Sequence, residues 1–147
     1  MKISVQEAPF DAGAEIAGFG AGRADIGAVV TFTGLVRDDT GALEALELEH
    51  YPGMTERAIA KIAEEAMARW ALADCLVIHR YGRLAVGEAI MMVATAARHR
   101  AAAFEAAEFL MDYLKSRAPF WKKEHSASGE TAWVAAKDAD EDALRRW

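Results

Sequence analysis

Two lysines on either side of a proline are the residues with the clearest capacity for chemistry. Lys115 lies near the end of a predicted helix, Pro119 must stop that helix, and Lys122 follows after two aromatic residues. At 100° per residue, Lys115 falls about 20° from Phe104, at the edge of an apolar stripe. The other members of the stripe are Ala107, Leu110, Met111 and Leu114. Partial burial there would lower the lysine pKa, as a lysine base or nucleophile requires near neutral pH. The alternative is a lysine whose stem covers the core while its charge stays in water.

Basic residues cluster around these lysines, although the chain as a whole is acidic. The net charge is −6, yet residues 98–123 hold six basic and three acidic side chains. Such a segment is either a pocket for a small anion or a solvated helix face. If the chain folds back after Pro119, Arg117, Lys122 and Lys123 converge on Lys115 and bind an anionic substrate. If it does not, these lysines merely flank two aromatic core residues.

Further basic groups lie at the ends of predicted elements. His99 and Arg100 directly precede the helix that carries Lys115, where free backbone N–H groups favour a phosphate. A capping or surface role is the alternative for this pair. Arg37 ends a glycine-containing strand at a turn, from which its guanidinium either reaches into a cleft or stays at the surface.

Composition and spacing argue against several classes of protein. An acidic chain is unlike a general nucleic-acid binder. No apolar run approaches the roughly 18 residues of a membrane span, and the first residues lack the apolar core of a signal peptide, so we expect a cytoplasmic protein. The single cysteine, Cys75, lies among apolar residues and is expected to fill the core rather than act as a nucleophile. The four histidines show no metal-ligand spacing, so we expect no metal.

The apolar pattern predicts strands interrupted by two main helices. The strands are expected over Lys2–Gln6, Ile26–Val36 with a bend at Gly34, Leu43–His50, Cys75–Tyr81, Ala89–Ala96, Phe120–His125 and Thr131–Ala135. The helices are expected from an Asp11 cap to Phe19, from a Thr55 cap to Trp70, over Ala101–Arg117 and over Asp140–Trp147. The turn at residues 38–41 should join two strands into a hairpin, and residues 126–130 should close another. Together these features predict an α+β fold with a mostly antiparallel sheet, in one domain of residues 1–147.

Five motifs, in this order and over nearly the whole chain, resemble the large, catalytic subunit of molybdopterin synthase. They are Gly27–Asp38, Leu48–Met54, Ile78–Gly82, His99–Arg100 with Ala103–Phe104, and Met111–Glu124. The resemblance implies an α/β hammerhead-type fold. It also implies a homodimer with a small ubiquitin-like sulfur-carrier subunit bound at each end, giving a heterotetramer. The Gly-Gly thiocarboxylate of that partner would enter a pocket, and two sulfur transfers would convert cyclic pyranopterin monophosphate into the dithiolene of molybdopterin. This sulfurtransferase would need no resident cofactor.

The same resemblance implies roles for individual residues. Lys115 and Lys122 match catalytic lysines. Arg37, His99 and Arg100 match family residues that bind the substrate's phosphate or pterin. Lys123 and Glu124 complete the matching substrate-contacting stretch. Phe32 and Met111 match positions that line the family's pocket, and Lys137 lies where the family often has another basic residue. Whether Lys115 is a base or a nucleophile stays open. So do two other functions: a non-catalytic module that binds a ubiquitin-like tail and an anion, and a purely structural dimer. Convergence of the basic groups in space would favour the enzyme.

Overall fold

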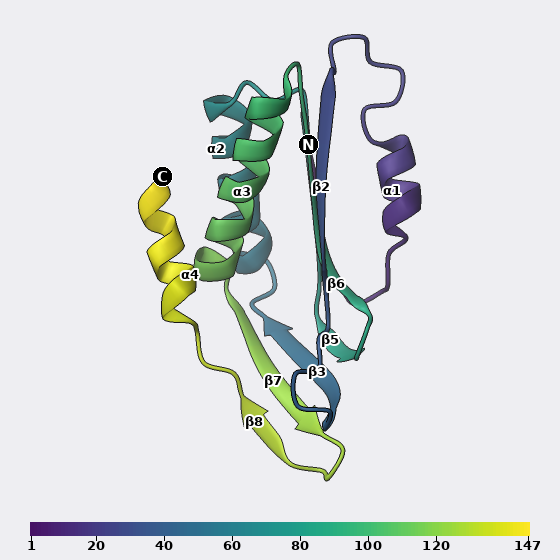
Figure 1. Cartoon of the computed structure of the whole chain (residues 1–147), viewed down its shortest axis with the longest axis vertical. Coiled ribbons are helices and arrows are strands. Elements are labelled where there is room, and N and C mark those ends of the chain that lie inside the picture. Colours follow the sequence, from purple (N-terminus) through teal and green to yellow (C-terminus); the bar gives the residue numbers. More distant parts are fainter.

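Two four-stranded β-sheets form the framework of the chain, which the computed structural model describes over residues 1–147 (Figure 1). The first sheet has the order β1 (Lys2–Gln6), β4 (Asp74–Arg80), β6 (Ala89–Ala97), β2 (Ala28–Leu35). The second has the order β5 (Gly82–Ala85), β3 (Leu43–His50), β7 (Phe120–Ser126), β8 (Thr131–Trp133). Only the β1–β4 pair is parallel. The predicted α+β class is therefore confirmed, with two sheets in place of one.

The helices cover both faces of the first sheet. Helices α2 (Met54–Arg69) and α3 (Arg100–Arg117) pack side by side on one face, and the short α1 (Ala12–Gly18) lies on the other (Figure 1). Helix α4 (Asp138–Ala143) and a 3₁₀ turn (Leu144–Arg146) pack beside α3. Among these helices, none combines the length and the apolar character that a bilayer crossing would require.

The main core lies between the first sheet and the α2–α3 pair. Strands β4 and β6 are buried on both faces, so successive residues point alternately toward the two helix layers. Val77 and Val93 pack toward α2 and α3, whereas Leu76 and Met92 pack toward the α1 side. Cys75 is fully buried in the main core, and burial raises the pKa of its thiol to about 12. The interpretation of Cys75 as core filler is therefore confirmed.

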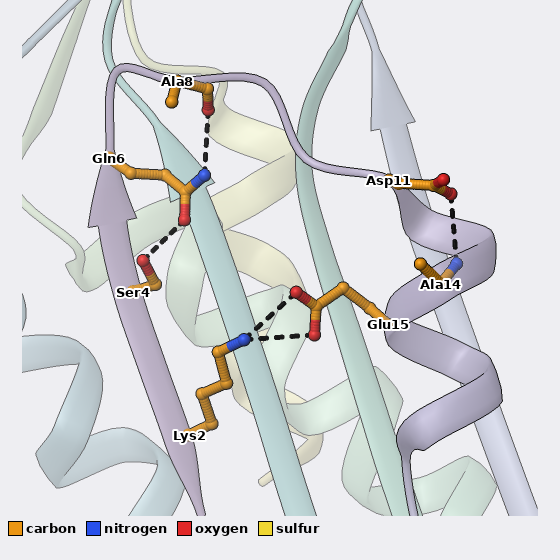
Figure 2. A network of polar contacts seen from close by, with 7 residues as sticks. All are labelled: Lys2, Ser4, Gln6, Ala8, Asp11, Ala14 and Glu15. Atoms are coloured by element: carbon orange, nitrogen blue, oxygen red, sulfur yellow. Dashed lines mark hydrogen bonds and ion pairs between the residues drawn. The ribbon is translucent and has the colours of Figure 1, made fainter.

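Helix α1 is attached to the first sheet by polar contacts that Figure 2 shows. The predicted cap is confirmed: the Asp11 side chain accepts a 3.0 Å hydrogen bond from the backbone N–H of Ala14. Lys2 of β1 reaches across to both carboxylate oxygens of Glu15, at 3.1 Å each. The Lys2–Glu15 pair joins α1 to the sheet, and the apolar side chains around α1, Phe10, Ala12 and Phe19, cover the face that Leu76 and Met92 would otherwise expose.

The hairpin predicted between the strands around Val30 and Leu46 is wrong. Strand β2 ends in a bulge at Gly34–Leu35 and pairs with β6, whereas β3 belongs to the second sheet and pairs with β5 and β7. In the intervening loop the Asp38 carboxylate accepts hydrogen bonds from the backbone N–H groups of Thr40 and Gly41. The turn was located correctly, but it carries the chain from one sheet to the other.

Two smaller expectations also need correction. The connection at residues 82–88 contains strand β5, which the sequence pattern did not predict. The cap of α2 is Gly53, at a φ of 82°, rather than Thr55. Glu56 closes the cap by accepting a 2.6 Å hydrogen bond from the Gly53 N–H.

Thr55 instead joins the start of α2 to the junction between α3 and β7. Its fully buried hydroxyl accepts a hydrogen bond from the Tyr51 N–H at 3.0 Å and donates one to the Pro119 carbonyl at 3.1 Å. These two bonds fix the position of the chain at the point where the helix ends and the strand begins. Thr55 is therefore a structural residue of the segment that contains both lysines.

We expect Thr55→Val to lower the free energy of unfolding by about 1–3 kcal/mol, because the isosteric side chain leaves both backbone partners without the hydroxyl. Thr55→Ser keeps the hydroxyl and is the matched control, with a smaller loss that reflects the missing methyl group. Urea unfolding of the two variants measures the difference. Equal stability of the valine and serine variants would show that the hydroxyl does not hold this junction.

Candidate active site

Lys115 and Lys122 lie on either side of the junction between α3 and β7. Ala118 adopts an extended conformation (φ −78°, ψ 126°), as the proline that follows it requires, and β7 begins two residues later. Strand β7 then runs away from the end of α3 along β3, with Lys122 opposite Leu48 (Figure 1). The positive charge of Lys115 lowers the pKa of Lys122, so the two lysines act on each other across this junction.

Lys122 is the more buried of the two lysines. Residues alternate along β7, so Lys122 shares a face with Phe120 and Glu124, opposite the buried Leu48. Burial lowers the pKa of the Lys122 amine, and the positive charges of Lys115 and Lys137 lower it further, against an opposing effect of Asp140. Lys115 itself is exposed. The partial burial predicted for Lys115 is thus wrong for the single chain and is found at Lys122 instead.

The orientation of α3 explains why Lys115 is exposed although the sequence pattern predicted its partial burial. Phe104, which the sequence pattern placed on the stripe, is 61% exposed. The buried face of α3 consists of Ala103, Ala106, Ala107, Phe109, Leu110 and Leu114. Small alanines allow α3 to approach the sheet closely, so the contact face is centred on them and not on the large Phe104. Lys115 therefore lies outside the core contact.

A buried histidine lies next to the lysines. The ring of His79, on β4, stacks on Phe120 at a centroid distance of 3.8 Å, and its Nδ1 lies 2.9 Å from the Arg80 carbonyl oxygen. A carbonyl oxygen only accepts, so Nδ1 carries the proton and Nε2 the lone pair. Burial lowers the pKa of His79 to about 4, and the charges of Lys122, Lys115 and His50 act in the same direction. His79 is therefore neutral at pH 7 and adds no third charge beside the lysines.

Lys123 lies on the opposite face of β7 from Lys122. Its ammonium is 5.3 Å from the ring centroid of Trp133, its partner on β8, which is a cation–π arrangement. The predicted convergence of Lys123 with Lys115 and Lys122 is therefore wrong. Strand alternation alone separates neighbouring residues in this way.

Arg37 and Glu124 meet in a separate pocket of about 340 Å³ beyond Lys122. Its lining residues include Asp38, Thr40, Glu130 and Thr131 from the loop after β2 and the β7–β8 hairpin. Arg37 is exposed and pairs with Asp39 at 2.8 Å. Because Glu124 shares the β7 face of Lys122, this pocket lies further along the same strand face as the lysine cluster.

His99 and Arg100 lie at the other end of α3 from Lys115. Lys115 is 15 positions after Arg100, which corresponds to about 22 Å along the helix axis. Both residues are exposed, and His99 caps α3 without a side-chain hydrogen bond. Phe32, on the outer strand β2 of the first sheet, is 43% exposed. Within one chain, therefore, His99 and Arg100 do not converge with the lysines.

Comparisons with known proteins identify the family of this chain. Residues 5–117 match the family model described as "MoaE protein". The molybdopterin synthase catalytic subunit of Cereibacter sphaeroides is 71% identical over 147 residues, covering 100% of both chains. The chain belongs to the MoaE family.

Solved structures of similar proteins have the same fold. The molybdopterin biosynthesis MoaE protein from Burkholderia ambifaria superposes with a TM-score of 0.85 at 51% identity, covering 99% of this chain and 97% of that one. Molybdopterin synthase from Staphylococcus aureus superposes with a TM-score of 0.81 at 30% identity, covering 90% and 96%. The resemblance seen in the sequence is therefore confirmed at the level of family and fold.

In this MoaE chain, the sequence-derived site residues separate into groups. Lys115, Lys122 and Lys137 form one cluster, and the half-buried Met111 lies one helical turn before Lys115. Arg37 and Glu124 form the second group. The residues outside both groups are Phe32, His99, Arg100 and Lys123.

Two residues of the lysine cluster were not predicted. His79 was considered as a metal ligand and as part of the Ile78–Gly82 motif, but not as a site residue, although a histidine inside an otherwise apolar run is an available signal of a buried polar role. Asp140 was considered only as the first residue of a predicted helix. Nothing in its local sequence indicates that it faces Lys122, because tertiary packing of α4 on α3 brings the two together.

Because His79 is held neutral, we expect it to make the stability depend on pH. The pKa is lower in the folded chain than in the unfolded chain, so the unfolded chain binds more protons between pH 6.5 and about 4. The free energy of unfolding should therefore fall by up to about 3 kcal/mol as the pH drops through this window. The His79→Phe variant keeps a ring against Phe120, and its free energy of unfolding should fall less over the same pH window. Urea unfolding at pH 7 and pH 4.5 tests this, and parallel losses in both proteins would contradict it.

Proposed function

We propose that this chain is the catalytic, sulfur-transferring subunit of a molybdopterin synthase. It would take sulfur from the C-terminal Gly-Gly thiocarboxylate of a small ubiquitin-like carrier and give it to cyclic pyranopterin monophosphate, forming the dithiolene of molybdopterin. The observation that carries the proposal is the cluster of Lys115 and Lys122, in which a half-buried amine has a lowered pKa. The full-length similarity to chains named molybdopterin synthase catalytic subunit supports it.

The lysine cluster has the chemistry that sulfur transfer requires. A thiocarboxylate is negatively charged, and the ammonium groups of Lys115 and Lys137 attract it into the site. Transfer forms a carbon–sulfur bond to the pterin side chain and breaks the carbon–sulfur bond of the carrier, whose acyl carbon takes an oxygen from water and is released as a carboxylate. A lysine with a lowered pKa contributes by accepting a proton or by attacking the acyl carbon of the carrier tail. Lys122 has this lowered pKa.

The substrate's phosphate requires further cations, and we assign this role to Arg37, His99 and Arg100. His99 and Arg100 lie too far from Lys115 to act in the same chain, so a second copy has to supply them. Strand β2 is an outer strand with three exposed apolar residues, Val29, Phe32 and Leu35, and it packs beside α3. An apolar sheet edge of this kind is normally covered, and a homodimer would cover it. Carriers bound at the two lysine clusters would complete a heterotetramer.

Reconstitution tests the function directly. The purified chain is incubated with a thiocarboxylated carrier and cyclic pyranopterin monophosphate, and the dithiolene product is assayed. We expect product only when all three components are present and the carrier tail ends in a thiocarboxylate. Product formed equally well with a carboxylate tail, or no product at all, would contradict the proposal.

The two neighbouring lysines of β7 provide a matched pair of variants. We expect Lys122→Ala to lower kcat by about 100-fold or more, because it removes a reactive amine. Lys123→Ala should change kcat by less than about threefold, because that side chain lies on the other face of β7. Turnover of both variants is measured in the reconstituted assay. Equal losses of kcat would show that Lys123 also takes part in the reaction.

Lys115→Arg separates the charge of Lys115 from its proton chemistry. Besides attracting the tail, Lys115 is assigned a part in the transfer itself, as a base or a nucleophile. Arginine keeps the positive charge but does not lose its proton, so we expect turnover to be nearly abolished. The same reconstituted assay measures this variant. Near-normal turnover would show that Lys115 supplies charge alone.

A further inference from the structure

The segment after β8, residues 134–147, is fastened along α3, and we call it the arm. At its start, the Val134 N–H donates a 2.8 Å hydrogen bond to the carbonyl of Lys122. Further along, Glu141 of α4 pairs with Arg117 at 2.7 Å. The arm therefore holds both sides of the α3–β7 junction, the strand through Val134 and the helix end through Glu141.

The far end of the arm is held by Asp112 of α3. One Asp112 oxygen accepts hydrogen bonds from the guanidinium of Arg146 and from the indole N–H of Trp147, each at 2.7 Å. Arg146 also pairs with Glu108, one turn earlier. The Asp112 side chain is only 13% exposed, so these charge-assisted bonds are better shielded from water than those of a surface ion pair.

Aromatic packing adds to this attachment. The Trp147 ring meets Trp70 and Phe109 edge to face, each at a centroid distance of 5.6 Å. The guanidinium of Arg69 lies 5.7 Å from the Trp147 ring centroid. The arm thus ends against residues of both α2 and α3, far more firmly than a free terminal segment would.

Between its two ends the arm carries charged groups to the lysine cluster. Lys137, the cap of α4, and Asp140, in its first turn, both act on the Lys122 amine. Neither side chain forms an ion pair or hydrogen bond with α3. Their positions therefore depend on the anchoring contacts of the arm, which are made by Val134, Glu141, Arg146 and Trp147.

We propose that the arm is a positioning element for Lys122, and that Asp112 is the residue that fastens it. This inference rests on the proposed function, because it concerns the reactivity of the same lysine. The functional consequence is that contacts of Asp112, three residues before Lys115 and remote from β7, tune the chemistry of Lys122.

The direction of the effect follows from the groups that face Lys122. Lys115 faces it from α3, Lys137 and Asp140 from the arm, and the neutral His79 from β4, while Glu124 follows it on β7. Of these influences, burial has the largest effect on the pKa of Lys122. Releasing the arm hydrates the amine and removes one positive and one negative neighbour. The pKa of Lys122 should therefore rise, and less of the amine should be neutral at a given pH.

The test uses neighbouring arginines as a matched pair. Arg146→Ala removes the contacts to Asp112 and Glu108. Arg145→Ala is the control, because Arg145 is 83% exposed and pairs only with Asp142 inside the arm. Trp147→Ala releases the same anchor through its other contact, and Arg146→Lys should restore part of the effect because it keeps the charge.

Amine acetylation of the whole chain by acetic anhydride across a pH series, read by peptide mass spectrometry, gives the midpoint of Lys122, with exposed Lys61 as reference. We expect the Lys122 midpoint to rise by about 0.5 unit or more in Arg146→Ala and Trp147→Ala, and to stay constant in Arg145→Ala. The pH profile of turnover should move the same way.

An unchanged Lys122 midpoint in both anchor variants, or an equal rise in the Arg145 control, would overturn the proposal. A purely structural anchor would lower thermal stability without moving the midpoint, which also counts against it. If the midpoint rises as expected but no variant or parent chain forms dithiolene, the proposed function fails while the positioning role of the arm stands.

Discussion

The switch from helix to strand at Ala118–Pro119 is the constraint on which the site depends. Proline keeps Ala118 extended, so α3 ends and β7 starts within two residues. Phe120, the first residue of β7, packs against both the main core and the small core of the second sheet. Its stack on His79 and the Thr55 bond to Pro119 fix this position from two further directions. The two lysines that flank the junction are therefore brought together by the backbone, before any substrate binds.

This junction produces a local environment unlike the rest of the molecule. The chain carries a net charge of −6, yet the positive charges of Lys115 and Lys137 both act on the half-buried amine of Lys122. Mutual repulsion and loss of hydration both favour the neutral form of Lys122. His79, on the buried side of the lysine cluster, is neutral and adds no further positive charge. An anionic tail entering the cluster would offset the repulsion between the lysine ammonium groups. Binding of a thiocarboxylate is therefore linked to the protonation state of Lys122.

Features that depend on neighbouring residues were predictable from the sequence, and features that depend on distant packing were not. The Asp11 cap and the stop at Pro119, which brings the two lysines together, each depend on residues a few positions apart. Strand pairing was not predictable from the turn after β2, since β2 and β3 find their partners in different sheets through distant apolar contacts. Asp140 likewise reaches the site through packing of α4 on α3. The separation of Lys123 from Lys122 could have been predicted from strand alternation.

Complementation between two defective copies tests most directly whether the site is shared between chains, because about 22 Å of helix separates Arg100 from Lys115 within one copy. Chains carrying Arg100→Ala and chains carrying Lys115→Ala are each expected to be inactive. In a mixed dimer, one site combines the intact Lys115 of one copy with the intact Arg100 of the other. A purified mixed dimer carrying two different tags should therefore recover about half of the parent activity. No activity in that mixed dimer would contradict a shared site and show that each site is built from one chain.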